Sequence, residues 1–412
     1  MFSNSSFLNF KFLGYILVLF SSILFLFGEI INDRFWLADF EVYYKAAERI
    51  INSENLYRIE KDGYYIFKYS PTSAIFFIPF LIFSFSIAKY IYWFFITLTI
   101  ILSFKLCIKL NKYYNSINIT FTNQNLILIP AIFILAIHYL RELHLGQVNQ
   151  LLCLIFILMS YFFINNNKLG FSSCLAISIF IKPFTLIFIP YLIFKKKYKE
   201  LLFFILFTLI LFSLPFIFYK SFDTTIHQYK LWINELQIEL SNKQSLNQNA
   251  NHTVFSVLSR MTPIGYFLNL NYNFFKLIYQ IVVLLIIGIA YLFFFTSNSN
   301  NLKFNKINIV YDFGLLISTI PLIAFTSENA FIFTQLLVFI LLSQFKNLLK
   351  HEKLIACLAF IFIGGDFKEL IGDKISDFLN HHSFISIGTI LLIILLFRLR
   401  FRQKKEIKPD YH

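Results

Sequence analysis

Charged side chains are scarce in this sequence. Asp, Glu, Lys and Arg make up only 14% of its 412 residues, whereas soluble domains usually carry about a quarter. The chain therefore has too little charge to cover a water-facing surface of ordinary size. Hydrophobic residues reach 58% and aromatic residues 20%, including 56 Phe. A lipid-facing surface can hold that many rings, so the composition indicates an integral membrane protein.

Several chemical signatures are also absent. The sequence has no GxxxxGK[ST] phosphate loop, so nothing indicates an ATP-driven pump. It has no HExxH or GxSxG motif, and no DxD pair that would support nucleotide-sugar chemistry with a bound metal. None of the four cysteines forms a CxxC pair with another, so we expect no disulfide framework and no zinc site. We predict neither a metal nor a cofactor.

The net charge of +14 would suggest a nucleic-acid partner in a soluble protein. Here, however, Lys and Arg fall mostly in short clusters between apolar runs, which is the pattern of cytoplasmic loops in membrane proteins. We therefore predict that the chain contacts a lipid bilayer and no nucleic acid. Its abundance of Lys, Asn, Ile, Phe and Tyr is typical of an A+T-rich genome, which favours a bacterial plasma membrane.

A transmembrane helix needs about 20 apolar residues. By this measure residues 1–412 form a single all-α membrane domain with about ten to twelve spans, the first of them retained because no small-residue cleavage site follows it. Two short segments, 71–85 and 353–365, could be re-entrant or half-helices. The predicted spans are 12–31, 71–85, 87–108, 125–140, 147–164, 169–193, 200–219, 275–296, 309–326, 330–346, 353–365 and 383–400.

Two polar stretches, 32–70 and 220–273, lack basic clusters, and we place both on the outer face. Cytoplasmic clusters lie instead at Lys195–Lys199, Lys346–Lys353 and Arg398–Lys405. Each outer loop has an apolar stripe at helical spacing, which predicts an amphipathic helix along the membrane surface. The stripes are Phe40, Tyr43, Tyr44, Ala47, Ile50 and Ile51 in the first loop, and Ile226, Tyr229, Ile233, Leu236 and Leu240 in the second.

The lysines at 105, 109 and 112 conflict with this topology. They predict a cytoplasmic end for span 87–108, but two full crossings at 71–85 and 87–108 would place that end outside. Either the segment 71–85 does not cross the membrane, or the lysines reach water on the outer side.

Asp39 lies just beyond the first predicted span, at the start of the surface helix. It could be a helix N-cap, a position that Asp fills well. It could also be a general base, because a carboxylate at the edge of an apolar protein can accept a proton from a bound hydroxyl. Both roles can coexist.

Further candidate residues occur within or next to the apolar runs. Pro71, in Tyr69-Ser70-Pro71, suits the first turn of a helix. Lys182-Pro183 interrupts an apolar run, and a cation at a break in a helix should line a cavity. The remaining candidates suit phosphate or sugar oxygens, although each could also belong to an ordinary polar loop. They are Arg141, His144, Gln147 and Asn149 between two spans, and Asn251, His252 and Arg260 in the second outer loop.

Taken in order, four stretches resemble the GT-C superfamily of membrane glycosyltransferases. They are most similar to glycosyltransferase family 87, the polyprenyl-phosphate-mannose-dependent mannosyltransferase type. The stretches are Asp39–Ala47 running on to Tyr57, Tyr69-Ser70-Pro71 with Pro79, Gly146-Gln147-Val148-Asn149, and Ile181-Lys182-Pro183 with Pro190. They cover the first half of the chain, whereas the second half is similar mainly in pattern.

The resemblance implies a GT-C-type helix bundle and a defined reaction. Asp39 would be the catalytic base that deprotonates a glycan or glycolipid acceptor. The acceptor oxygen would displace the phosphate of a polyprenyl-phosphate-linked hexose, expected to be mannose, with inversion and on the outer, periplasmic side. The implied substrate-binding residues are Tyr43, Tyr44, Tyr69, Arg141, His144, Gln147, Asn149, Lys182, Asn251, His252 and Arg260.

Two other classes remain open from the residues. A transporter or flippase of lipid-linked saccharides should show inverted repeats and paired broken helices. The sequence shows one clear break, at Lys182. A surface-polysaccharide polymerase or ligase usually shows paired Arg residues in a large outer loop, but the stretch 220–273 contains only Arg260.

Overall fold

The computed structural model describes residues 12–63, 65–114, 121–242, 246–295, 302–324 and 328–406. The chain is 83% helical, and no strand occurs in the parts described. Eight helices within these ranges are long and apolar enough to cross a membrane, and four shorter apolar helices accompany them. The four shorter helices are Pro71–Ile82, Asn149–Ile164, Lys168–Ile181 and Pro183–Phe194. The expectation of an all-α integral membrane protein is confirmed.

The chain divides into two compact units. One consists of residues 18–103 and 139–243 and is called the first unit here. The other consists of residues 1–17, 104–138 and 244–412 and is called the second unit. Three helices have residues in both: α1 (Leu13–Ile31), α4 (Phe85–Tyr114) and α5 (Phe121–Leu145).

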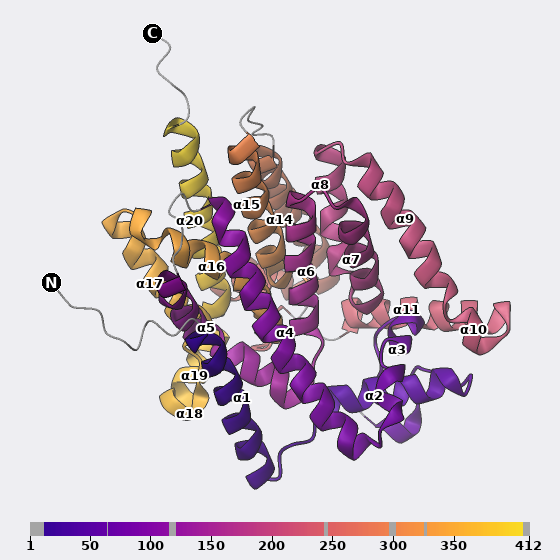
Figure 1. Ribbon diagram of the computed structural model, residues 1–412. Helices are drawn as coiled ribbons and strands as arrows, with labels where there is room; N and C mark the ends of the chain where they lie inside the picture. Colours follow the sequence, from indigo (N-terminus) through magenta and orange to yellow (C-terminus); the bar gives the residue numbers. More distant parts are fainter. Residues whose placement is uncertain are drawn as a thin grey trace. The chain divides into compact units, whose positions relative to one another are not determined.

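The first unit contains α2, which lies across the ends of the upright helices α6 and α7 (Figure 1). Helix α7 packs against α6, α9 and α3, and α2 packs against α3 and η3. The bounds in this unit are α2 (Ala38–Ile51), η2 (Glu60–Asp62), α3 (Pro71–Ile75), η3 (Ile78–Ile82), α6 (Asn149–Ile164), α7 (Lys168–Ile181), η4 (Pro183–Ile187), α8 (Phe188–Phe194), α9 (Tyr198–Ser213), α10 (Phe216–Tyr219) and α11 (Phe222–Asn242).

The predicted span 169–193 is broken at Lys182, as expected, but it is not one crossing. Phe163, near the end of α6, contacts both Phe171 near the start of α7 and Tyr191 in the middle of α8, with ring centroids 5.2 and 5.8 Å apart. The chain therefore reverses between α7 and α8. Lys182 lies at the tip of this hairpin, because Pro183 cannot continue the hydrogen-bonding pattern of α7.

The predicted span 71–85 is also not a crossing helix. It forms the five-residue α3 and the five-residue 3₁₀ segment η3, and both pack on α2. The start of α4 lies there too, since the Phe40 ring is 6.0 Å from that of Phe85 and stacks at 4.1 Å on that of Tyr92. Helix α4 thus runs from the α2 end toward its own lysine-bearing end, which agrees with the first of the two alternatives for these lysines.

The two predicted amphipathic helices both form, as α2 and α11. In α2 the expected stripe is buried except for Ile51, which is 45% exposed. In α11 Tyr229 of the expected stripe is buried, Ile226 and Leu236 are partly buried and Ile233 is 51% exposed, while the Leu240 side chain lies outside the described residues. Two polar residues of the same helix, Gln228 and Glu235, are also buried. These polar side chains bind the loop after α2, where Gln228 Oε1 accepts from the Leu56 amide at 3.2 Å. The side of α11 that packs on the protein is therefore mixed, because it carries Tyr229 as well as the polar Gln228 and Glu235.

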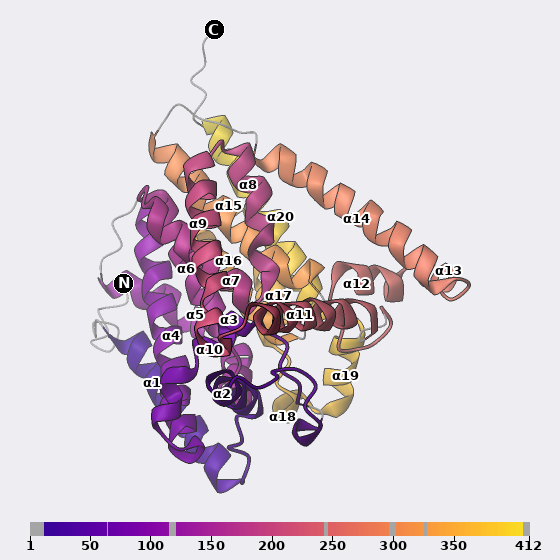
Figure 2. The ribbon, with the colours of Figure 1, turned by 90° about the vertical axis from the view of Figure 1, so that its right-hand side faces the viewer.

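The second unit has its most buried residues in α15 and α16, and α20 packs against both and against α17. Arg400 of α20 is paired with Asp312 of α15 at a buried position. Figure 2 shows α12, α13 and α14 following one another. The bounds are α12 (Val254–Met261), α13 (Ile264–Leu268), α14 (Tyr272–Phe295), α15 (Leu302–Ile323), η5 (Glu328–Thr334), α16 (Gln335–Gln344), η6 (Phe345–Asn347), α17 (Lys350–Gly364), α18 (Lys368–Ile371), α19 (Asp373–His381) and α20 (Phe384–Glu406).

Candidate active site

Asp39 is the second residue of α2. The N-cap of this helix is Leu37, which has left-handed φ and ψ of 48° and 53°, so the prediction that Asp39 is the N-cap is wrong. An acid in the first turn is still favourable, because the helix dipole is positive there. The turn that contains Gly146 approaches the start of α2 closely here. A Cβ on Gly146 would lie 2.9 Å from Phe40 Cβ, and Gly146 itself has a φ of +69°. This glycine brings the turn between α5 and α6 directly against the start of α2.

The surroundings of Asp39 act on its carboxyl in opposite directions. Burial raises the pKa of Asp39 above its usual range, while a hydrogen bond from the Gln147 side chain and the charges of Lys182 and Lys68 lower it. Burial dominates, so the pKa is raised overall. A carboxylate with a raised pKa is a better proton acceptor than an ordinary Asp, provided it is ionised.

A chain of side-chain hydrogen bonds continues from Gln147 to Lys182. The Asn149 amide donates to Gln147 Oε1 at 2.5 Å, and Lys182 Nζ donates to Asn149 Oδ1 at 2.6 Å. Asn149 is 1% exposed, whereas Asp39, Gln147 and Lys182 are only partly buried. Two amides therefore lie between Lys182 and Asp39, because Gln147 also interacts with the Asp39 carboxyl.

Glu142 also belongs to this network, because it binds Asn149. It was not among the residues predicted from the sequence. Its carboxylate is fully buried and accepts from Asn149 Nδ2 at 2.7 Å and from the backbone amide of Gln150 at 2.9 Å. The second bond is to the N-terminus of α6, where anions are favoured. The sequence signal for it was an acid between Arg141 and Leu143, seven residues before Asn149.

Two tyrosines border the same group. The hydroxyls of Tyr43 and Tyr69 are 3.0 Å apart, and Lys182 Nζ lies 5.8 Å from the centre of the Tyr69 ring. Burial is the main cause that raises the pKa of both tyrosines, and the neighbouring Asp39 adds to it. Both hydroxyls therefore remain neutral and can donate or accept hydrogen bonds.

The segment before α3 attaches to the end of α7. Ser70 caps α3, with its Oγ accepting from the Ser73 amide at 3.2 Å, and Pro71 occupies the first turn as predicted. The Ser70 amide donates to the carbonyl of Phe180 at 3.2 Å. This bond fixes Tyr69 beside the hairpin tip that carries Lys182.

Three other predicted residues of the first unit make different contacts. Tyr44 donates its hydroxyl to the carbonyl of Phe83 at 2.8 Å. His144 Nδ1 is 2.5 Å from the buried carboxylate of Glu29, a second acid that sequence reasoning missed. Arg141 precedes Glu142 on α5 and is partly exposed, on a different side of the helix.

The predicted residues of the second outer loop belong to the second unit and form a cluster of their own. Arg260 donates to the carbonyls of Gln248 and Asn251 at 2.9 and 2.8 Å. His252 Nδ1 is 3.1 Å from Ser383 Oγ. Burial lowers the pKa of Arg260. These contacts order the loop that precedes α12.

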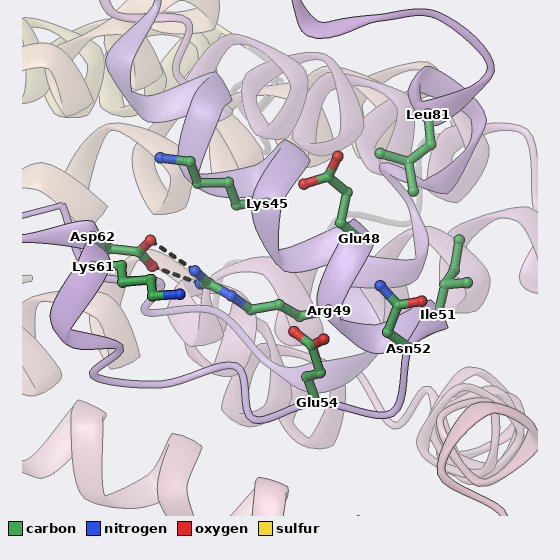
Figure 3. A pocket seen from close by; sticks show the side chains of 9 residues that line it. All are labelled: Lys45, Glu48, Arg49, Ile51, Asn52, Glu54, Lys61, Asp62 and Leu81. Atoms are coloured by element: carbon green, nitrogen blue, oxygen red, sulfur yellow. Dashed lines mark hydrogen bonds and ion pairs between the residues drawn. The ribbon is translucent and has the colours of Figure 1, made fainter.

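A separate pocket of about 480 Å³ lies along α2 (Figure 3). Arg49 forms a bidentate ion pair with Asp62 across it, with N–O distances of 2.6 and 2.7 Å. None of the residues of the Asp39 network lines this pocket. Its lining consists of Lys45, Glu48, Arg49, Ile51, Asn52, Glu54, Lys61, Asp62 and Leu81.

Within the described ranges, no three His, Cys, Asp or Glu side chains stand close enough to hold a metal ion. The Asp39 network itself contains a proton acceptor, a cation and neutral hydroxyl and amide groups. Such a set can bind a polyhydroxylated ligand and deprotonate one of its hydroxyls, and it can stabilise negative charge near Lys182.

No curated protein matches the chain. The sequence profile of glycosyltransferase family 87 matches residues 67–319. This range includes Tyr69, Glu142, Gln147, Asn149 and Lys182, and it begins after Asp39. The match extends over more than half of the chain, and it agrees with the apolar helices and with the resemblance seen in the sequence motifs. The chain is therefore a multi-pass membrane enzyme that belongs to glycosyltransferase family 87.

Proposed function

We propose that this glycosyltransferase moves a hexosyl unit from a polyprenyl-phosphate sugar to a glycan or glycolipid on the outer face of a bacterial plasma membrane. The hexosyl unit that we propose is mannosyl. Asp39 is the general base. The observation that carries this proposal is the connection of Asp39 to Lys182 through Gln147 and Asn149. It places a proton acceptor and a cation in one network, as a displacement with an anionic leaving group requires.

The proposed reaction is a single displacement. Asp39 takes the proton of an acceptor hydroxyl while the oxygen of that hydroxyl forms a bond to the anomeric carbon. The bond between that carbon and the phosphate oxygen breaks on the opposite side, and its electron pair stays with the lipid phosphate. The configuration inverts, and the proton ends on Asp39. Lys182 stabilises the charge that grows on the phosphate.

The direction of α6 supports an outer active site. Lys197 lies 5.2 Å from the ring centre of Phe163, at the end of α6, whereas Asn149 begins that helix beside Lys182. The basic cluster 195–199 and Asp39 are therefore at opposite ends of the first unit. Because basic clusters stay cytoplasmic, this arrangement favours Asp39 on the outer side.

The other predicted residues receive supporting roles in the proposal. Tyr43, Tyr44 and Tyr69 bind sugar or acceptor hydroxyls, and the amides of Gln147 and Asn149 help to orient them. Arg141 and His144, the remaining predicted residues of the first unit, bind phosphate or sugar oxygens.

The test uses the purified full-length protein in detergent with labelled polyprenyl-phosphate mannose and octyl mannoside as the acceptor. Asp39→Asn should lower transfer by about 10²- to 10⁴-fold, the range for loss of a general base, while binding of the donor is retained. Glu200→Gln, a change at another buried acid of the same unit (5% exposed), serves as the control and should transfer normally. Unchanged transfer by Asp39→Asn would overturn the proposed function.

A further inference from the structure

The amide groups between Asp39 and Lys182 have only one consistent orientation. Ionised Glu142 can only accept hydrogen bonds, and the ammonium group of Lys182 can only donate them. Asn149 contacts both, so its NH₂ group must face Glu142 at 2.7 Å and its oxygen must face Lys182 at 2.6 Å. The same NH₂ group also donates to Gln147 Oε1 at 2.5 Å. Gln147 must then present its own NH₂ group to Asp39.

We infer that Glu142 is a positioning residue for the reaction: through Asn149 and Gln147 it dictates that the base Asp39 receives a hydrogen bond and that Lys182 is held beside it. Glu142 acts through these two side chains and does not touch substrate. The inference rests on the proposed role of Asp39. It goes beyond it because it assigns a function to a buried carboxylate that lies outside the motifs of the resemblance.

Glu142→Gln is an informative substitution because the new side chain has the same shape. The backbone amide of Gln150 is a fixed donor that is bound to the carboxylate at 2.9 Å. The oxygen of the new amide should turn toward this fixed donor. Its NH₂ group then faces the NH₂ group of Asn149, which can no longer donate there. Asn149 rotates or moves away, and Gln147 loses the contact that orients it.

The measurable consequence is a change in the pH profile. Gln147 lowers the pKa of Asp39 by donating a hydrogen bond, so loss of that bond raises the pKa. Transfer requires ionised Asp39, so kcat/KM rises with pH as Asp39 ionises. This rising part of the profile, the acid limb, should move to higher pH. A hydrogen bond to a charged group corresponds to a shift of about one pH unit.

This direction distinguishes positioning from a simple charge effect. Removal of a negative charge near Asp39 would by itself lower the pKa of that acid and move the limb to lower pH. The charged and titratable groups that interact with Asp39 come from several elements, and all of them except residue 142 stay in place in the variant. These groups are Lys68, Lys182, Tyr43, Tyr69, Tyr92 and Glu142.

The experiment compares the wild type, Glu142→Gln, Asn149→Ala and Gln147→Leu in the transfer assay between about pH 4 and 9, with labelled polyprenyl-phosphate mannose and octyl mannoside. All three variants should shift the acid limb upward, and Glu142→Gln combined with Gln147→Leu should shift it no further than Gln147→Leu alone. If Glu142→Gln does not fold, Asn149→Ala carries the same test, because the connection runs through Asn149.

An unshifted limb, or a downward shift, in Glu142→Gln overturns the inference, and so does an unshifted limb in Asn149→Ala. The control Glu200→Gln should leave the limb unchanged. These results are separate from the test of the proposed function. If Asp39→Asn loses transfer while Glu142→Gln keeps a wild-type profile, only the role of Glu142 fails. If Asp39→Asn remains fully active, the proposed function fails as well.

Discussion

The Nζ atom of Lys182 donates to Asn149 Oδ1 at 2.6 Å, which joins the tip of the α7–α8 hairpin to the first residue of α6. Lys182 has an extended backbone, with a φ of −144°, because Pro183 follows it. A lysine inside a continuous helix would have to face lipid or a packed neighbour. At a hairpin tip its ammonium can reach both a buried amide and a ligand.

Lys182→Met should affect the pH profile as well as the rate. The charge of Lys182 lowers the pKa of Asp39, so its removal raises that pKa and moves the acid limb of kcat/KM upward by about one pH unit. The rate above the limb should also fall at least about 10-fold, because the leaving phosphate loses a cation. Initial rates at saturating and limiting donor across the pH range measure both effects.

Lys182→Arg is the matched control for the charge. Its acid limb should stay near that of the wild type, even if its rate falls because the guanidinium has a different shape. An equal upward shift in both variants would show that the ammonium charge does not act on Asp39.

Gly146→Ala should disrupt the site although it adds one methyl group. The new Cβ would lie 2.9 Å from Phe40 Cβ and 3.1 Å from Leu37 Cβ, at a residue with a φ of +69°. The strain and the overlap together cost about 1–3 kcal/mol of unfolding free energy, and relief requires α2 to move away from the α5–α6 turn. Because that movement separates Asp39 from Gln147, activity should fall more than the loss of stability alone explains.

Gly28→Ala tests whether this effect is local. No atom lies within 4 Å of a Cβ at Gly28, which is in the interior of α1. Alanine favours a helix interior by roughly 0.5–1 kcal/mol over glycine, so this variant should be as stable as the wild type or more so. Thermal unfolding in detergent and transfer rates of both variants give the comparison.

Local sequence patterns predicted most helix positions because each span is a long apolar run. The run 87–108 corresponds to α4, and 275–296 to α14 (Tyr272–Phe295). The reversal at Lys182 was not predictable in the same way. Pro183 indicates that a helix stops, but whether the chain continues across or returns depends on packing of Phe163 against both Phe171 and Tyr191. That contact links three segments that no local pattern connects.

The candidate site shows the same difference between what local sequence patterns predict and what depends on contacts between segments. Asp39 was predicted from its place just beyond the first span and from the family resemblance, and Gln147, Asn149 and Lys182 from their polarity at membrane depth. The structure brings the four together. Glu142 was missed because its importance depends on two donors from the next helix, Asn149 and the amide of Gln150.

The burial of polar residues on α11 was not predicted, for a similar reason. Glu235 is buried because Arg58, from a loop far away in the sequence, binds it with N–O distances of 2.5 and 3.0 Å. A period of apolar residues shows only which side of a helix avoids water. In a membrane protein that side can face lipid, and the polar side can then pack on the protein.

Asp62→Asn should destabilise the first unit by weakening the bidentate ion pair with Arg49. The two side chains are 13% and 10% exposed, and this pair fastens the loop after α2 to the helix that carries Asp39. Loss of one partner leaves a largely buried guanidinium without its counter-charge, which costs about 1–3 kcal/mol. Thermal unfolding in detergent should therefore show a lower midpoint.

Glu41→Gln provides the comparison for that variant on the same helix. Glu41 pairs with Lys45 at 2.7 Å, but the two side chains are 43% and 39% exposed, and a pair that faces water contributes at most about 0.5 kcal/mol. Its unfolding midpoint should match the wild type. If Asp62→Asn unfolds at the wild-type temperature as well, the pair does not hold the loop, and the position of α2 must depend on Gly146 and the aromatic contacts of Phe40 instead.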